Sequence, residues 1–128
     1  MTTPNDVELG PVSLTVPARP EYVRLVRMAA SDSGARADLS IEDIEDLRIA
    51  VDELAYALLG DETGNTSMTL HYSAAPGVVE IHGSCAGHGG PMVVSDLSRT
   101  IVGGVADEYD VTDDSGVRRF RLVKRTRA

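Results

Sequence analysis

Three things are scarce in this 128-residue sequence: cysteine, long apolar runs, and basic charge outside its last residues. Because Cys85 is the single cysteine, an intrachain disulfide and a zinc site built from several cysteines are both excluded. No apolar run approaches the roughly 20 residues that a membrane-spanning helix needs. Residues 1–11 lack the basic start and the apolar stretch of a signal peptide. We therefore expect a soluble, cytoplasmic protein with no membrane partner.

Acidic residues outnumber basic ones over most of the chain, and the net charge is −8. Residues 1–64 hold thirteen acidic and five basic side chains, and residues 65–117 hold seven against one. The last eleven residues reverse the balance, with six basic side chains and no acidic one. Most of the surface should repel a polyphosphate backbone, so nucleic acid is not expected as a direct partner. We interpret the basic end as a strand with a solvated arginine face; the alternative is docking to an acidic protein surface.

The spacing of apolar residues predicts strands at 12–16, 68–73, 78–82, 109–112 and 117–124. It predicts helices from Pro20 to about Ser33, from a cap at Ser40 to Gly60, and from about Asp96 to Asp107. Hairpins combined with three helices indicate an α+β two-layer sandwich, with a mixed or antiparallel sheet covered by helices on one face. We expect one domain over residues 1–128, with a flexible stretch at 1–10.

Local signals predict where these elements end. Gly34 ends the first helix by offering a left-handed conformation. Ser40 caps the second helix, with Asp43 three residues on in a capping-box arrangement. Residues 83–90 read as a glycine-rich loop. The residues expected to face inward from the third helix and the last strand are Leu97, Ile101, Val102, Val105, Phe120 and Leu122.

Glu53 is the first candidate for chemistry. The residues one turn before it and one turn after it on the second helix are apolar: Ile49, Ala50, Tyr56 and Ala57. A carboxylate in such a patch is either partly desolvated, which suits general-base work, or covered by something that binds there. The alternative is a half-exposed glutamate that pairs with a nearby arginine.

The loop and the histidines carry weaker signals. Glycines at 83–90 could let backbone N–H groups cradle an anion, but the spacing matches neither the P-loop nor the dinucleotide fingerprint, so a plain flexible loop is the alternative. His71 and His82 fall on adjacent predicted strands, and His88 falls on the loop. Their spacing does not resemble a metal-ligand set, so no metal site is predicted.

The order of elements, together with three segments, resembles the anti-sigma-factor serine kinases of the GHKL (Bergerat-fold, histidine-kinase-like) ATPases. The segments are Pro20 to Arg24, Asp46 to Glu53, and Asp107 to Val111. The resemblance implies the histidine-kinase-like ATPase fold and a dimer. It also implies binding of a sigma factor. Fully equipped family members phosphorylate a serine on an anti-anti-sigma factor, using ATP and Mg²⁺.

This sequence departs from the family at the nucleotide-binding positions. Glu53 is retained, but the asparagine that holds magnesium four residues later is replaced by Ala57, which has no oxygen ligand. In the family's Asp-x-Gly-x-Gly box, Gly87 and Gly89 remain but Cys85 replaces the aspartate that accepts the adenine amino group. The glycine pair of the phosphate lid falls near Asp96 and Ser98, and the lid is shortened. These departures from the family pattern imply weak or lost use of ATP and Mg²⁺.

Two functions remain open at this point. One is a binding module that sequesters a sigma factor and is released by an anti-anti-sigma factor. Arg24 then matches a partner-contact position of the family, although it could also be an ordinary surface arginine. The other is an active serine protein kinase with an unusual site, in which Glu53 acts as base.

Overall fold

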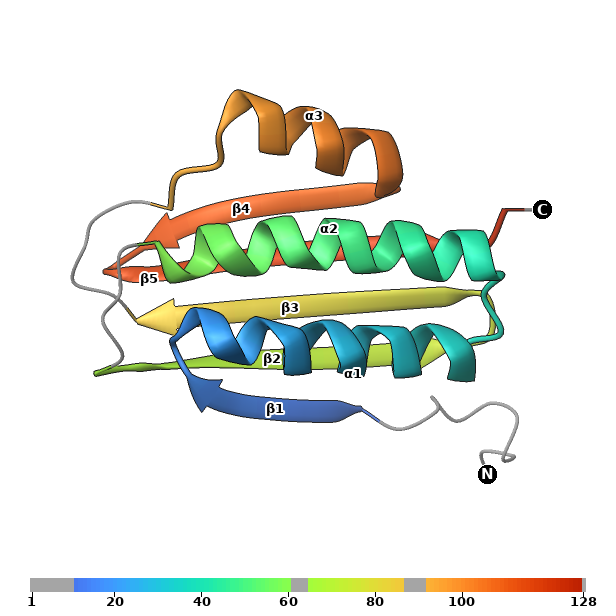
Figure 1. The fold of residues 1–128 in the computed structure, drawn as a ribbon, viewed down its shortest axis with the longest axis horizontal. Coiled ribbons are helices and arrows are strands. Elements are labelled where there is room, and N and C mark those ends of the chain that lie inside the picture. Colours follow the sequence, from blue (N-terminus) through green and yellow to red (C-terminus); the bar gives the residue numbers. More distant parts are fainter. Residues whose placement is uncertain (1–10, 61–64, 87–91, 128) are drawn as a thin grey trace.

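Figure 1 shows the computed structural model, which describes residues 11–60, 65–86 and 92–127. The elements follow the predicted order, with a short 3₁₀ turn added before the first helix. Their bounds are β1 Val12–Pro17, η1 Pro20–Tyr22, α1 Val23–Arg36, α2 Ile41–Leu59, β2 Ser67–Ala75, β3 Val78–Ala86, α3 Asp96–Val105, β4 Glu108–Asp114 and β5 Val117–Arg125. The predicted flexible stretch, residues 1–10, lies outside the described residues.

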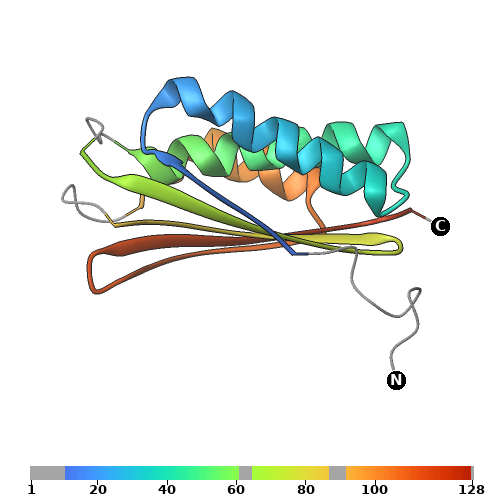
Figure 2. The same ribbon diagram turned by 90° about the horizontal axis from the view of Figure 1, so that it is seen from below.

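The five strands form one sheet in the order β1-β2-β3-β5-β4, and every neighbouring pair is antiparallel. All three helices lie on the same face of this sheet, and no described helix covers the other face (Figure 2). The predicted two-layer α+β sandwich is thus confirmed, with a purely antiparallel sheet. The described helices include none with the length and apolar character needed to cross a bilayer.

The core lies between α2 and the middle of the sheet. One side of α2 is apolar and buried at Leu47, Val51, Leu54 and Leu58, and the inward residues of the central strands pack against it. Tyr72 on β2 is also buried, and its hydroxyl donates a hydrogen bond to the Val26 carbonyl oxygen at 3.0 Å. This bond ties α1 to the sheet and gives a buried polar group its partner.

The ends of α2 follow the prediction, but the end of α1 does not. Ser40 accepts a hydrogen bond from the Asp43 N–H at 3.1 Å, and Gly60 follows the helix at φ 55°. The prediction that Gly34 ends α1 is wrong, because α1 continues to Arg36 and the left-handed residue is Asp38 at φ 63°. Gly34 instead allows α2 to approach: a Cβ there would lie 2.9 Å from Ile44 Cγ1.

Two further expectations need correction. Residues 83–86 belong to β3 rather than to a loop, because Gly83 faces the helices and the Phe120 side chain occupies the space that a Cβ would take. Only the part of the predicted loop from residue 87 onward lies outside the described residues. Leu97 is 70% exposed rather than inward-facing, and Val102 is the buried residue of α3.

The basic end of the chain is only partly the solvated face that the sequence suggested. β5 alternates between the two faces of the sheet, so Arg118 and Lys124 point toward the helices and are buried. Lys124 Nζ donates a hydrogen bond to the Val105 carbonyl oxygen at 2.9 Å, and the same atom lies 3.7 Å from Asp43 Oδ1. The tertiary structure therefore buries two of the six basic residues, and Lys124 does so beside acidic partners.

Candidate functional site

Glu53 lies on α2 and is contacted by a side chain from α3. The Ser98 hydroxyl donates a hydrogen bond to Glu53 Oε1 at 2.7 Å. Ser98 is held in turn by Ser95, the N-cap of α3: Ser95 Oγ accepts from the Ser98 N–H at 3.0 Å and lies 3.1 Å from Ser98 Oγ. The first turn of α3 is thus fastened to the middle of α2 through Glu53.

Neither of the two interpretations of Glu53 accounts for this contact completely. The half-exposed glutamate is present, but its partner among the described residues is a serine and not the arginine of the alternative. A serine hydroxyl that donates to a carboxylate has the geometry of general-base chemistry. Here, however, the hydroxyl belongs to the chain itself. It occupies the position beside Glu53 that the serine of a phosphate-accepting protein would need.

Ala57 lies one turn beyond Glu53 on α2 and is half-buried. Its methyl group offers no oxygen to a hard cation such as Mg²⁺. Among the described residues there is no group of three or more His, Cys, Asp or Glu side chains that could hold a metal ion. At this position of α2 the chain therefore supplies no side-chain oxygen that could hold a magnesium ion.

Cys85 is buried on β3 and faces the helix layer, and its cross-strand partner on β5 is Arg118. The Arg118 guanidinium donates to the Leu59 carbonyl oxygen at 3.3 Å, at the C-terminal end of α2. A cation at this position is favoured by the helix dipole. Cys85 is therefore buried on the helix side of the sheet, in register with Arg118. Gly87 and Gly89 lie outside the described residues.

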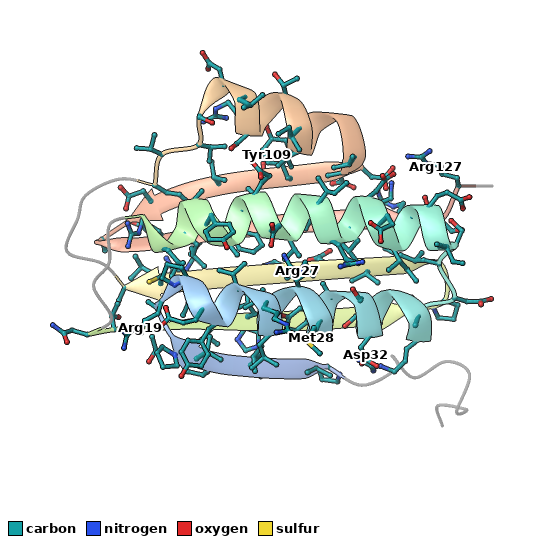
Figure 3. All side chains as sticks on the ribbon, in the orientation of Figure 1. Arg19, Arg27, Met28, Asp32, Tyr109 and Arg127 are labelled. Carbon is teal, nitrogen blue, oxygen red and sulfur yellow. The ribbon has the colours of Figure 1, made fainter. Side chains whose placement is uncertain are left out.

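Arg24 lies in the first turn of α1 and is exposed, as expected of a partner-contact residue and equally of an ordinary surface arginine. The structure adds two apolar neighbours that the sequence did not single out: Leu25 is 43% exposed and Met28 56%. The spacing i, i+4 puts Arg24 and Met28 on one side of the helix, and Figure 3 shows Met28 on the outer side of α1. We call Arg24, Leu25 and Met28 the α1 patch.

The α1 patch is held in a fixed position relative to the Glu53 site. Arg27 donates a hydrogen bond to Asp52 Oδ1 at 2.9 Å, and this part-buried ion pair joins α1 to α2. Figure 3 shows Arg27 between these two helices. Because Asp52 directly precedes Glu53, the same helix carries the contact to α1 on one side and the contact to α3 on the other.

Comparison with known proteins identifies the family. No protein-family model matches the chain. The serine-protein kinase RsbW of Listeria monocytogenes serovar 1/2a is 38% identical over 114 residues, which cover 85% of this chain and 67% of that protein. The chain belongs to the RsbW family. RsbW of Listeria innocua is 42% identical over 65 residues, 47% of this chain and 41% of that protein, so this match spans less than half of the relative's length.

A solved structure supports the RsbW fold. The crystal structure of the RsbU and RsbW domains of a Mycobacterium tuberculosis protein superposes with a TM-score of 0.71, over 91% of this chain and 32% of that chain. Sequence identity is 19%, so this likeness bears on the fold alone. The resemblance to the anti-sigma-factor serine kinases, drawn from the element order and three short segments, is therefore confirmed at the level of the family.

RsbW serine kinases in general use ATP and Mg²⁺. This RsbW-family chain has altered side chains at three of the positions that the sequence comparison assigned to nucleotide or metal binding. The Ala57 side chain has no oxygen, Cys85 is buried in register with Arg118, and Glu53 Oε1 accepts a hydrogen bond from Ser98. The sequence had singled out Ser98 only as a lid position; its contact with Glu53 could not be found from spacing, because 45 residues separate the two.

Proposed function

We propose that this RsbW-family protein is an anti-sigma factor that binds and sequesters a sigma factor, and that an anti-anti-sigma factor releases it. ATP use is weak or lost. Family membership supports the binding function, and the altered nucleotide positions support the loss of catalysis. The resemblance also implies a homodimer, and the sequence composition led us to expect a cytoplasmic protein; we include both points in the proposal.

The hydrogen bond between Ser98 and Glu53 is the observation that carries the loss of catalysis. Phosphoryl transfer depends almost entirely on positioning and on neutralising charge. A carboxylate that serves as base must be free to accept the proton of the partner's serine. Here the carboxylate is engaged by an internal serine, and the nearby Ala57 removes the oxygen that would hold a magnesium ion.

The α1 patch is the surface we assign to the sigma factor. It combines an arginine, which can form two parallel hydrogen bonds with a carboxylate, with two exposed apolar side chains. Arginine surrounded by apolar contact area is typical of residues that dominate binding energy at protein interfaces. The assigned role of Glu53 is to hold α3 in place rather than to act as a base.

The partner function is tested by measuring the affinity of the purified chain for candidate sigma factors by calorimetry. Arg24→Glu should weaken binding by at least tenfold, which corresponds to about 1.4 kcal/mol. Arg99→Glu, on exposed α3, makes the same charge change away from the α1 patch and should leave the affinity unchanged. A chain that binds no sigma factor would rule out the proposed function.

The loss of ATP use is tested by thermal unfolding with and without Mg-ATP. A ligand present at 100 times its Kd adds about 2.7 kcal/mol to stability, which shifts the midpoint visibly. We expect no shift at millimolar nucleotide. A clear magnesium-dependent shift, together with phosphate transfer to an anti-anti-sigma factor, would favour the alternative of an active serine kinase.

A further inference from the structure

Two histidines stand opposite each other on the face of the sheet that no described helix covers (Figure 2), here called the helix-free face. His71 on β2 and His82 on β3 are register partners, and both are exposed. Their chain neighbours Tyr72 and Ile81 point into the core, so the alternation of a strand puts both imidazoles on the other face. Directly opposite residues on antiparallel strands have Cβ atoms about 4.5–5.5 Å apart. We call His71 and His82 the histidine pair.

Each imidazole of the histidine pair uses one ring nitrogen for a contact with a neighbouring oxygen. The Ser13 hydroxyl on β1 lies 2.7 Å from His71 Nδ1. The Glu80 carboxylate, two residues before His82 on β3, lies 2.5 Å from His82 Nε2. The second nitrogen of each ring, His71 Nε2 and His82 Nδ1, has no hydrogen-bond partner among the residues that the structure describes. The pair therefore offers two ring nitrogens to a ligand.

One anchored nitrogen and one open nitrogen on each ring is the pattern typical of histidines that bind metal ions. A metal-bound imidazole almost always has its other ring nitrogen hydrogen-bonded to a carboxylate, a carbonyl group or water, which fixes the tautomer and the ring orientation. Glu80 supplies this carboxylate for His82. The hydrogen bond with His82 and the charge of Arg121 hold the pKa of Glu80 below its ordinary value, so that the carboxylate stays ionised. A proton held on His82 Nε2 leaves the lone pair on Nδ1.

The charge of the helix-free face favours a cation. Its described acidic side chains outnumber its arginines: the former are Glu80, Glu108, Asp110 and Asp114, and the latter are Arg119, Arg121 and Arg125. Arg121 is the arginine in register with His82. Its charge is compensated by three carboxylates, which lie 3.4 Å away at Glu80, 3.3 Å at Glu108 and 3.7 Å at Asp110. An approaching cation therefore meets no uncompensated positive charge at the residue opposite His82.

We propose that the histidine pair binds one divalent transition-metal ion of the zinc, nickel and copper group, through His71 Nε2 and His82 Nδ1. Imidazole suits these ions, whereas Mg²⁺ and Ca²⁺ take oxygen ligands. Two nitrogens on the same zinc ion lie about 3–3.5 Å apart, a separation that two rings on opposite residues span by side-chain rotation alone.

The histidine pair is an open site with two protein ligands. Among the described residues no group of three His, Cys, Asp or Glu side chains forms a complete metal centre, so water occupies the remaining coordination positions. Both imidazoles line a hollow of about 560 Å³ on the helix-free face, which leaves room for that water. The site lies on the opposite face of the sheet from the helices and is independent of the proposed sigma-factor function.

The test is a calorimetric titration of the full, tag-free chain with Zn²⁺ and, separately, with Mg²⁺. Saturable binding of one Zn²⁺ per chain is expected, and no binding of Mg²⁺ at the same concentration. Long-range ¹H–¹⁵N NMR of the histidine rings then identifies the ligand atoms, because the ¹⁵N shifts of His71 Nε2 and His82 Nδ1 should change on saturation. Absence of saturable Zn²⁺ binding would overturn the proposal, and so would shifts confined to His88.

Single-histidine variants assign the two ligands. His71→Ala and His82→Ala should each reduce the affinity for Zn²⁺ at least tenfold, because one imidazole alone cannot chelate the ion. His88→Ala removes the remaining histidine of the chain and should leave the affinity unchanged. Equal Zn²⁺ affinity of all three variants would contradict the proposal.

A second matched pair tests the contact that orients His71. Removing such an outer contact typically reduces metal affinity by about 10–100-fold, so Ser13→Ala should weaken Zn²⁺ binding about tenfold. Thr15→Ala removes a hydroxyl group from the same strand, but Thr15 contacts Thr69 at 3.1 Å and not a histidine. Its Zn²⁺ affinity should equal that of the unmodified chain. Equal affinity of the two variants would show that Ser13 does not orient a metal ligand and would contradict the assignment of His71 Nε2.

Discussion

Ser98 in the first turn of α3 donates a 2.7 Å hydrogen bond to Glu53 in the middle of α2. Both residues had separate interpretations in the sequence, one as a lid position and the other as a base. Their contact makes the two helices one unit on this side of the sheet. It also means that any ligand that needs the Glu53 carboxylate must first displace Ser98.

The contribution of this contact can be measured with Ser98→Ala. Hydrogen bonds to charged groups contribute about 1.5–3 kcal/mol when buried, and partial exposure here reduces the expected loss of unfolding free energy to about 1 kcal/mol. Thr100→Ala is the control, because the Thr100 hydroxyl bonds only within α3, to the Asp96 carbonyl oxygen. Equal urea midpoints for the two variants would show that the Ser98 contact contributes nothing.

Gly83 should not tolerate a side chain. A Cβ at Gly83 would overlap the Phe120 ring, which packs over it from the neighbouring strand. Gly83→Ala should lower the unfolding free energy by about 1–3 kcal/mol, the usual cost of overpacking a core. In a Phe120→Leu background the additional cost of Gly83→Ala should shrink, which a double-mutant cycle measures.

Gly103 in α3 supplies the opposite case for the same substitution. Nothing lies within 4 Å of a Cβ placed there, and the residue is exposed in a helix. Gly103→Ala should therefore raise the unfolding free energy by about 0.5–1 kcal/mol, because alanine favours the helix. If Gly83→Ala and Gly103→Ala changed the unfolding free energy in the same direction, the two positions would not differ in the space available for a Cβ.

Asp43 should make stability depend on pH in the acid range. Burial alone would raise its pKa, but the Arg127 N–H, the Ser40 contact and the charges of Lys124 and Arg127 together hold the pKa of Asp43 below its ordinary value. A carboxyl whose folded pKa is lowered stabilises the fold above its unfolded pKa, and loses that contribution as pH falls through the folded pKa. Urea midpoints should accordingly fall as the pH drops below about 4, the ordinary aspartate pKa.

Asp43→Asn separates this effect from other acid-sensitive groups. Removing one partner of a buried ion pair costs about 3–5 kcal/mol, because Lys124 is left buried beside a neutral group, although Asp46 at 3.4 Å compensates in part. The difference between the unmodified chain and Asp43→Asn should be largest near neutral pH and should narrow toward pH 3. A difference that is constant with pH would exclude Asp43 as the titrating group.

Leu97 and Val102 test the orientation of α3. Leu97 is 70% exposed and Val102 is fully buried. Leu97→Ala should change the unfolding free energy by less than about 0.5 kcal/mol, as exposed substitutions usually do. Val102→Ala removes two buried methyl groups and should cost about 2 kcal/mol. The reverse order of effects, measured by denaturant unfolding, would mean that α3 is rotated from the orientation described.

Local sequence determined the helices, the hairpins and the family. The apolar stripe of α2, its Ser40 cap and its terminal Gly60 act within a few residues of one another, so their spacing was sufficient to predict the helix. The segment from Asp46 to Glu53 and the substitutions Ala57 and Cys85 can be read from the chain alone. These residues indicated a member of the anti-sigma-factor serine kinases in which the nucleotide-binding residues are altered.

Tertiary structure decided which side chains meet. β5 lies between β3 and β4, and this insertion places Arg119 between Ser84 and Thr112 and buries Arg118 and Lys124. The contact of Ser98 with Glu53 and the role of Gly34 likewise depend on how the helices pack. Such partners are far apart in the chain, and hydrophobic spacing records only which face of an element is buried, not which residue lies opposite it.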